Sequence, residues 1–287
     1  MQTVRPAAVA GMFYPEARAA LHSAVRGYLE QAARGVGDKV PLPKALIVPH
    51  AGYVYSGPIA ASAYARIAPA RTTIRRVVLL GPVHRVPIRG LALPVAKAFA
   101  TPLGTVEIDP AGVADALALA QVRTSEAAHA LEHALEVQLP FLQGLLEEFR
   151  IVPFAVGDAT AAEVAAVIDR LWGGPETLIV VSSDLSHYHP YAEACTIDRR
   201  TSNEILALES SLDHEQACGA TPINGLALCA RRRGLAVELL DLRNSGDTAG
   251  DKSRVVGYAA FAFTEPEPDR ARRVAEAAAE VTEEAVA

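Results

Sequence analysis

The sequence of 287 residues predicts an α/β fold, a single domain in which a central mixed sheet is flanked by helices. Short apolar runs rich in Val, Ile and Leu alternate with longer Ala-rich stretches along most of the chain. This alternation is typical of strands whose two faces are both covered by helices. Hydrophobic residues make up 51% of the chain and charged residues 21%, so a sizeable core is expected and a disordered chain is excluded.

The apolar runs and the stretches between them predict the elements in order. We expect strands at Lys44–Val48, Arg76–Leu80, Val106–Ile108, Ile151–Val156, Leu178–Ser182, Val237–Asp241 and Val255–Phe263. We expect helices at Ala17–Ala33, Pro58–Ile67, Pro110–Ala120, Ala130–Phe149, Ala161–Trp172, Tyr191–Leu208 and Ile223–Arg233.

The domain is expected to span residues 1–264, because no repeat of fixed period and no Gly/Ser-rich linker divides this part. The run from Glu265 to Asp269 carries two prolines and ends the last strand. Residues 265–287 then form an acidic, Ala/Glu-rich C-terminal tail, which we interpret as a solvated appendix.

Charge and cysteine usage exclude several classes of function. Lys and Arg number 27 and Asp and Glu 33, so the net charge is −6 and the basic surface of a nucleic-acid-binding protein is not expected. A disulfide framework is not expected, because the chain has only three cysteines, an odd number: Cys195, Cys218 and Cys229. No segment has the apolar length of a signal peptide or a membrane span. We therefore expect a cytoplasmic protein with no membrane partner.

Three histidines follow predicted strands at the point where each strand ends. His50 follows the first strand, His84 the second and His187 the fifth. Ligands of α/β proteins gather at the carboxyl ends of the strands, and imidazole is the commonest metal ligand in proteins. The pattern predicts a metal or acid–base site where these three side chains meet.

A thiol is the expected fourth member of this site. Cys218 comes just before a predicted helix, and a thiol at a helix N-terminus usually has a lowered pKa. We therefore expect Cys218 to ionise readily, whereas Cys195 and Cys229 fall inside predicted helices and are expected to pack as small apolar residues.

Short motifs in a fixed order carry a resemblance to a known family. They are Arg5-Pro6, Ala10–Pro15, Pro49–Tyr53, Gly81–His84, Glu132–Pro140, Ser182–His187, Cys218-Gly219 and Asn244–Tyr258. Together they resemble the Memo family, and the last motif is similar to its bacterial and archaeal branch, the protein B type of the AmmeMemoRadiSam system.

The resemblance implies a fold shared with class III extradiol dioxygenases, which hold non-haem iron with two histidines and a glutamate. By similarity, His50 and His84 match the two histidine ligands, and Cys218 takes the place of the carboxylate. His187 matches the acid–base residue, with Asp184 beside it as a group that orients one of the histidines.

The pocket is expected to be lined by Tyr53, Glu132 and His133. The implied cofactor is a transition metal, iron or copper first and zinc second, because a thiolate is a soft donor.

Three functions follow as hypotheses. The first is a metal-dependent oxidoreductase, dioxygenase-like, with an open His/His/Cys site. The second is a non-catalytic binding or scaffold module that keeps the pocket for a small molecule or peptide and acts beside a radical-SAM protein and an Ammecr-type protein. The third is a zinc peptidase, because His129 to His133 fits the pattern H-x-x-E-H.

The segment Gly246–Ser253 contains two glycines and a Lys-Ser pair, but its spacing does not fit a phosphate-binding loop. We interpret it as a turn that folds over the pocket.

Overall fold

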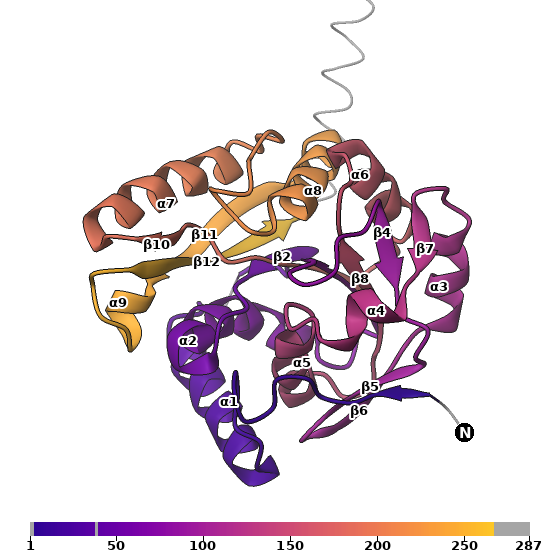
Figure 1. Cartoon of the computed structure of the whole chain (residues 1–287), viewed down its shortest axis with the longest axis horizontal. Coiled ribbons are helices and arrows are strands. Elements are labelled where there is room, and N and C mark those ends of the chain that lie inside the picture. The colour runs from indigo at the N-terminus through magenta and orange to yellow at the C-terminus, as the bar shows by residue number, and fades with distance from the viewer. Residues whose placement is uncertain (1–2, 38–39, 267–287) are drawn as a thin grey trace, which may run out of the picture.

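The computed structural model describes residues 3–37 and 40–266 (Figure 1). In this part of the chain, the main sheet has nine strands, in the order β10-β12-β2-β9-β3-β8-β4-β7, with β11 against β12. Its centre consists of four parallel strands, β2 (Ala45–Val48), β9 (Thr177–Ser182), β3 (Arg76–Pro82) and β8 (Arg150–Val156). On either side of this centre, β12 (Val255–Thr264) runs antiparallel to β2, and β4 (Leu91–Leu93) runs antiparallel to β8. The predicted mixed sheet is confirmed.

The remaining strands are short or lie near the edges. The main sheet also contains β7 (Val122–Thr124), β10 (His187–His189) and β11 (Ala236–Asn244). A separate small sheet joins β1 (Val4–Arg5), β5 (Ala98–Thr101) and β6 (Gly104–Glu107). The strand expected at Val106–Ile108 therefore belongs to this small sheet and not to the central one.

Helices cover both faces of the main sheet, and two hydrophobic cores result. In β2, the side chains of Leu46 and Val48 enter one core and those of Ala45 and Ile47 enter the other, as strand alternation requires. The first core is covered by α1 (Arg18–Ala33), α2 (Tyr53–Tyr64), the 3₁₀ helix η1 (Ala65–Ala70) and α5 (Leu139–Leu145). The second is covered by α3 (Pro110–Leu117), α6 (Ala161–Arg170), α7 (Tyr191–Leu206) and α8 (Ala220–Arg233). Figure 1 shows α1, α2 and α5 on one side of the sheet and α6, α7 and α8 on the other.

The single helix expected at Ala130–Phe149 is wrong. The chain instead forms α4 (Glu126–Ala130), an irregular segment, the 3₁₀ helix η2 (Glu136–Gln138) and then α5. The carboxylate of Glu132 accepts hydrogen bonds from the backbone N–H groups of His133 and Ala134, at 2.9 Å each. A side chain that captures backbone donors in this way competes with the helical pattern, and the helix ends before it.

A close approach of two elements fixes the segment that leads to His187. The carboxylate of Asp198, in α7, accepts a hydrogen bond from the backbone N–H of Ser186 at 3.0 Å. The same carboxyl group lies where a Cβ at position 257 of β12 would be, so only Gly257 leaves room for it. α7 and β12 thereby hold the end of the loop before β10.

The final strand ends at Thr264, and Glu265 accepts a hydrogen bond from the indole of Trp172 at 3.1 Å. Residues 267–287 of the expected acidic tail lie outside the described residues. Within the ranges 3–37 and 40–266, no helix has the length and apolar character to cross a membrane.

Candidate metal centre

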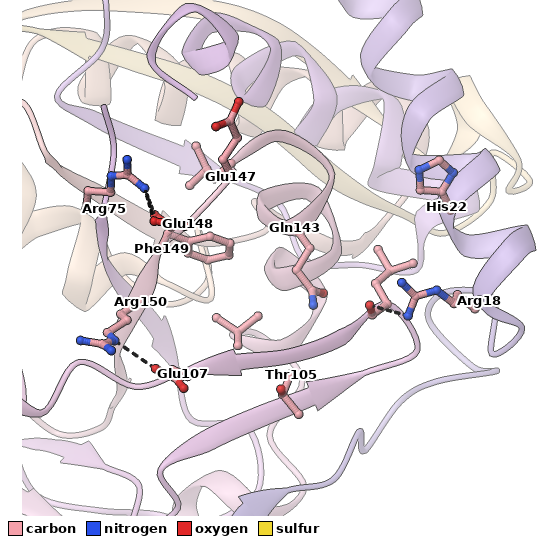
Figure 2. Close-up of a pocket in the computed structure, with 13 residues that line it drawn as sticks. Arg18, His22, Arg75, Thr105, Glu107, Gln143, Glu147, Glu148, Phe149 and Arg150 are labelled. Atoms are coloured by element: carbon pink, nitrogen blue, oxygen red, sulfur yellow. Dashed lines mark hydrogen bonds and ion pairs between the residues drawn. The ribbon is translucent and has the colours of Figure 1, made fainter. Parts of the chain in front are cut away.

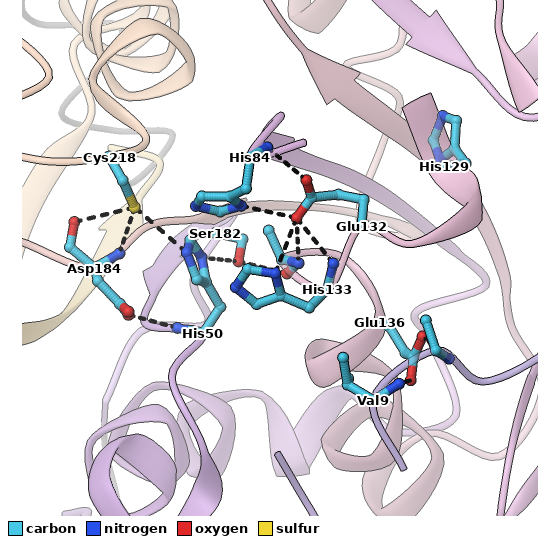
Figure 3. A network of polar contacts seen from close by, with 12 residues as sticks. Val9, His50, His84, His129, Glu132, His133, Glu136, Ser182, Asp184 and Cys218 are labelled. Carbon is cyan, nitrogen blue, oxygen red and sulfur yellow. Dashed lines mark hydrogen bonds and ion pairs between the residues drawn. The ribbon is translucent and has the colours of Figure 1, made fainter. Parts of the chain in front are cut away.

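Three imidazoles meet at the carboxyl ends of the central strands. His50 follows β2, His84 follows β3, and His133 comes from the irregular segment between α4 and η2. The ring centroids are 5.1 Å apart for His50 and His84, 5.4 Å for His50 and His133, and 4.5 Å for His84 and His133. One nitrogen from each ring lies within 4.8 Å of the others (Figure 3). We call these residues the three-histidine group.

His133 is the member that the sequence pattern placed only in the pocket lining. The H-x-x-E-H pattern did contain His133, but we interpreted the pattern as helical, which would place His133 on the same helix face as His129. The irregular backbone after α4 instead directs His133 toward His50 and His84.

The protonated nitrogen of His50 follows from its hydrogen-bonding partners. The single hydroxyl proton of Ser182 is donated to the carbonyl of Ala134 at 2.7 Å, and the Ser182 oxygen accepts from the amide of Gln138 at 2.9 Å. The His50 Nδ1 atom lies 2.9 Å from the same oxygen, so Nδ1 must be the donor. The unprotonated Nε2 is then free to bind a metal ion.

His84 is fixed in the same way by a carboxylate. Its Nδ1 lies 2.8 Å from Glu132 Oε1, and its backbone N–H donates to Glu132 Oε2 at 2.7 Å. Burial raises the pKa of Glu132, but the hydrogen bonds from His84 and from the backbone outweigh this and hold it at about 2. The ionised carboxylate therefore accepts the Nδ1 proton and leaves Nε2 of His84 as the open donor atom.

Two of the three imidazoles, those of His50 and His133, are neutral at ordinary pH. Burial, followed by the charge of His84, lowers the pKa of His50 to about 3. Burial and the neighbouring histidines lower that of His133 to about 4. Neutral imidazole is the form that coordinates a metal, so His50 and His133 can bind one without losing protons.

Cys218 lies beside His50, with its Sγ 3.3 Å from His50 Nε2 (Figure 3). It sits where the sequence predicts, directly before Gly219 and α8, but the expected readily ionised thiol is wrong. Burial, followed by the charge of Asp184, raises the pKa of Cys218 to about 12. In the absence of a metal the side chain is a neutral thiol.

Asp184 and His187 lie on the loop after β9. Asp184 Oδ1 accepts a hydrogen bond from the backbone N–H of His50 at 2.7 Å, so it positions the start of the His50 loop. Burial raises the pKa of this carboxyl group. His187 opens β10 and lines the same cavity as the three-histidine group.

This cavity, the site cavity, has a volume of about 640 Å³. Imidazoles and Asp184 form one part of its lining, and the aromatic side chains of Phe13, Tyr55, Tyr188 and Tyr258 form another. The turn that follows α9 (Ser245–Thr248) contributes Gly250 and Asp251. The segment Gly246–Ser253 therefore begins within this short helix, and the turn after it lines the cavity.

Two residues that were expected to line the pocket, Tyr53 and Glu132, are not among the residues that line the site cavity. Tyr53 is buried, and its hydroxyl donates to the carbonyl of Val137 at 2.6 Å. Glu132 is buried and holds His84 through Nδ1. A second cavity of about 550 Å³ is lined by Cys218 and by His84, so His84 forms part of the wall of both cavities.

His129 points away from the three-histidine group (Figure 3). Its Nε2 donates to the carbonyl of Ala92 at 2.8 Å, and the side chain is buried against Phe99. The two histidines of the pattern H-x-x-E-H therefore do not lie at one metal site. The zinc peptidase hypothesis required both as ligands and is not supported.

The N-terminal motif has a role that sequence reasoning missed. Glu136, fully buried, accepts hydrogen bonds from Arg5 at 2.6 Å, from the backbone of Ala8 and Val9, and from the hydroxyl of Tyr14 at 2.5 Å. These hydrogen bonds join the segment of residues 5–14 to Glu136. Phe13 at its end packs against His133, with ring centroids 4.6 Å apart.

A third cavity, of about 690 Å³, lies at the opposite ends of the strands (Figure 2). Its walls carry the ion pairs Arg75–Glu148 at 2.9 Å and Arg150–Glu107 at 3.1 Å. Because these charges neutralise each other, this larger hollow offers no donor set comparable to the three-histidine group.

Comparison with known proteins agrees with the motifs. The family model described as "Memo-like protein" matches residues 5–262. A MEMO1 family protein of Aquifex aeolicus is 38% identical over 281 residues, covering 91% of this chain and 99% of that protein. One from Methanosarcina barkeri is 36% identical over 279 residues, covering 90% and 99%. An uncharacterized protein of Escherichia coli K12 with a crystal structure covers 76% of this chain and 98% of its own, at 14% identity and a TM-score of 0.49, which is too distant to support an inference. The match to the family model and the identity to these full-length relatives show that the chain belongs to the Memo family.

Proposed function

We propose that this protein is a metal-dependent oxidoreductase with a non-haem centre. His50 and His84 hold the metal, and His133 and Cys218 are the two further donors beside them. The observation that carries the proposal is the convergence of three imidazole nitrogens, one from each ring, within 4.8 Å of one another. The Nδ1 atoms of His50 and His84 are held by Ser182 and Glu132, which leaves Nε2 of each ring for the metal.

The donor set fits a transition metal. Imidazole nitrogen and thiol sulfur are the ligands that iron, copper and zinc accept, whereas magnesium and calcium require oxygen ligands. The Glu132–His84 contact is the carboxylate–histidine arrangement that commonly orients a metal ligand. A metal ion at Cys218 would take the place of its thiol proton. Iron or copper is the proposed ion, with zinc as the alternative.

A metal of this kind supplies Lewis acidity and one-electron redox chemistry to a molecule bound in the site cavity. His187 is the proposed acid–base group. It lines the cavity, and within the described residues its ring makes no hydrogen bond, so both nitrogens are open to a bound molecule. Asp184 supports the His50 loop through the backbone contact at 2.7 Å.

A second candidate is a binding module without catalysis. The neutral thiol of Cys218, where the dioxygenases have a carboxylate ligand, favours it. The oxidoreductase and the binding module are distinguished by the rate of oxygen consumption of the metal-loaded protein in the presence of a reductant. A binding module should consume oxygen no faster than the same concentration of free metal. Association with a radical-SAM or an Ammecr-type protein stays a prediction.

The proposal is tested by metal analysis of protein purified without chelators. We expect about one iron or copper per chain in the wild type and loss of that metal in His50→Ala and His84→Ala. His22→Ala is the matched control, because His22 lines the cavity at the opposite ends of the strands. His133→Ala and Cys218→Ser, measured in parallel, identify the further donors.

Two results contradict the proposal. One is a wild type that carries no transition metal and takes up none on titration. The other is equal metal content in His50→Ala, His84→Ala and His22→Ala.

A further inference from the structure

The geometry points to a substrate class for the site cavity: a small, flat organic carboxylate, whose carboxylate binds Arg254 and whose apolar body lies against Tyr188. This inference rests on the proposed function for the role of the metal at the imidazole end. Carboxylate binding at Arg254 is a separate property that the protein keeps without metal.

Arg254 is the sole lysine or arginine among the residues that line the site cavity. Three other arginines, Arg232, Arg233 and Arg243, each pair with a carboxylate. Arg254 has no such pair within the part of the chain that the structure describes. An unpaired guanidinium at a cavity wall presents a planar fork of N–H donors, which matches a carboxylate in two parallel hydrogen bonds.

The acidic residue on the same turn does not neutralise Arg254. Asp251 also lines the cavity, but its Oδ1 accepts hydrogen bonds from the backbone N–H of Ser253 at 2.7 Å and from the Ser253 hydroxyl at 2.5 Å. These contacts hold the carboxylate within its own turn, so the guanidinium stays open to a ligand.

Tyr188 supplies a flat surface next to this charge. The guanidinium carbon of Arg254 lies 5.1 Å from the centre of the Tyr188 ring. Tyr188 has a φ of 62°, a conformation that is rare for a bulky residue, and 63% of the residue is exposed. Neither feature favours folding, and strained, exposed aromatic residues of this kind concentrate at ligand sites.

The backbone around Tyr188 explains how the ring is held there. The pairing of β10 with β12 changes register between His187 and His189, so the residue between them bulges out of the ladder. His187 then faces the same cavity that Tyr188 lines. The cavity thus has imidazoles on one part of its wall and an aromatic–cationic pair on another, and a ligand with two different ends fits both.

The test uses benzoate and its neutral isostere benzamide as probes, titrated by ligand-observed NMR against metal-free and metal-loaded protein. In both forms, the wild type should bind benzoate about 10-fold more tightly than benzamide, because a charge-assisted contact is lost with the amide. Arg254→Gln should remove this preference and Arg254→Lys should keep part of it. Arg199→Gln, which removes the same charge from an exposed position of α7, should behave as the wild type.

Tyr188→Gly tests the flat surface separately, since glycine adopts this φ without strain. We expect weaker binding of both probes, with the preference for benzoate retained. Equal affinity for benzoate and benzamide in the wild type overturns the inference, as does an equal effect of Arg254→Gln and Arg199→Gln. A protein that binds no metal but prefers benzoate refutes the metal proposal alone, whereas one that binds metal without this preference refutes the carboxylate inference alone.

Discussion

At the scale of single residues, one hydroxyl proton decides which nitrogen of His50 is open. Ser182 donates its proton to Ala134, so it can only accept from His50 and Gln138. The Gln138 amide is oriented in turn by the hydroxyl of Tyr64, which donates to its oxygen at 2.9 Å. This buried chain of hydrogen bonds extends from the core to the three-histidine group and sets its chemistry.

We expect Ser182→Ala to weaken metal binding by about 10- to 100-fold, because His50 loses the acceptor that fixes its tautomer and orientation. Competition with a chelator of known affinity measures the change. Ser202→Ala is the matched control, since the buried hydroxyl of Ser202 has no hydrogen-bond partner among the described residues. Equal metal affinity of the two variants would show that the hydroxyl of Ser182 is not needed.

We expect the buried imidazole of His129 to make the stability of the fold sensitive to acid. Burial lowers its pKa from 6.5 to about 4, and its Nδ1 has no partner in the described residues. Between pH 6.5 and 4 the unfolded chain binds a proton that the folded chain does not, so stability falls as the pH falls through this window. Urea unfolding at pH 7.5 and 5.0 should show that the wild type loses about 2 kcal/mol more than His129→Gln, which keeps a donor for Ala92. An equal loss in both would contradict this assignment, and the exposed His22→Gln should match the wild type.

At the scale of elements, one buried carboxylate bonds four residues of the segment 5–14. Glu136 bonds Arg5, Ala8, Val9 and Tyr14, and Arg5 also donates to the backbone carbonyls of His129 and Glu132 at 2.6 Å each. The N-terminus and the segment that carries His133 are therefore one structural unit, although about 120 residues separate them.

Glu136→Gln should lower the free energy of unfolding by about 3–5 kcal/mol, because it leaves the buried guanidinium of Arg5 without its counter-charge. Urea unfolding at pH 7.5 measures this. In contrast, Glu147→Gln breaks an exposed ion pair with Arg71 and should cost less than about 1 kcal/mol. If the two variants lower the free energy of unfolding by similar amounts, burial does not determine how much the Arg5–Glu136 pair contributes to stability.

At the scale of the whole molecule, the sequence predicted the sheet and most of the helices because nearly every central strand is apolar on both faces. It also placed His50 and His84 at one edge, since parallel strands end together. It could not place His133, because the predicted helix is broken where the carboxylate of Glu132 accepts hydrogen bonds from the backbone, which no periodicity reveals. The state of the Cys218 thiol was equally hidden, as burial outweighs the effect of a helix N-terminus only once the fold is known.

The proposed metal should also stabilise the whole domain, because the three histidines that would hold it come from separate segments that only the folded chain unites. At a free concentration 1,000-fold above the dissociation constant, a bound ion adds about 4 kcal/mol, or about 10 °C in Tm for a chain of this size. Differential scanning fluorimetry with and without metal measures the shift. The His50→Ala/His84→Ala double variant should show none, and a shift of the same size in it would place the stabilising ion elsewhere.

The contact between Gly257 and Asp198 has a consequence for evolution. A larger residue at position 257 can be accepted only if the carboxyl group from α7 is shortened or removed, because the two compete for the same space. The two positions should therefore covary. Among relatives, chains that replace the glycine should also have a smaller side chain opposite it, and an alignment in which the two sites vary independently would show that the neighbouring backbone can move apart.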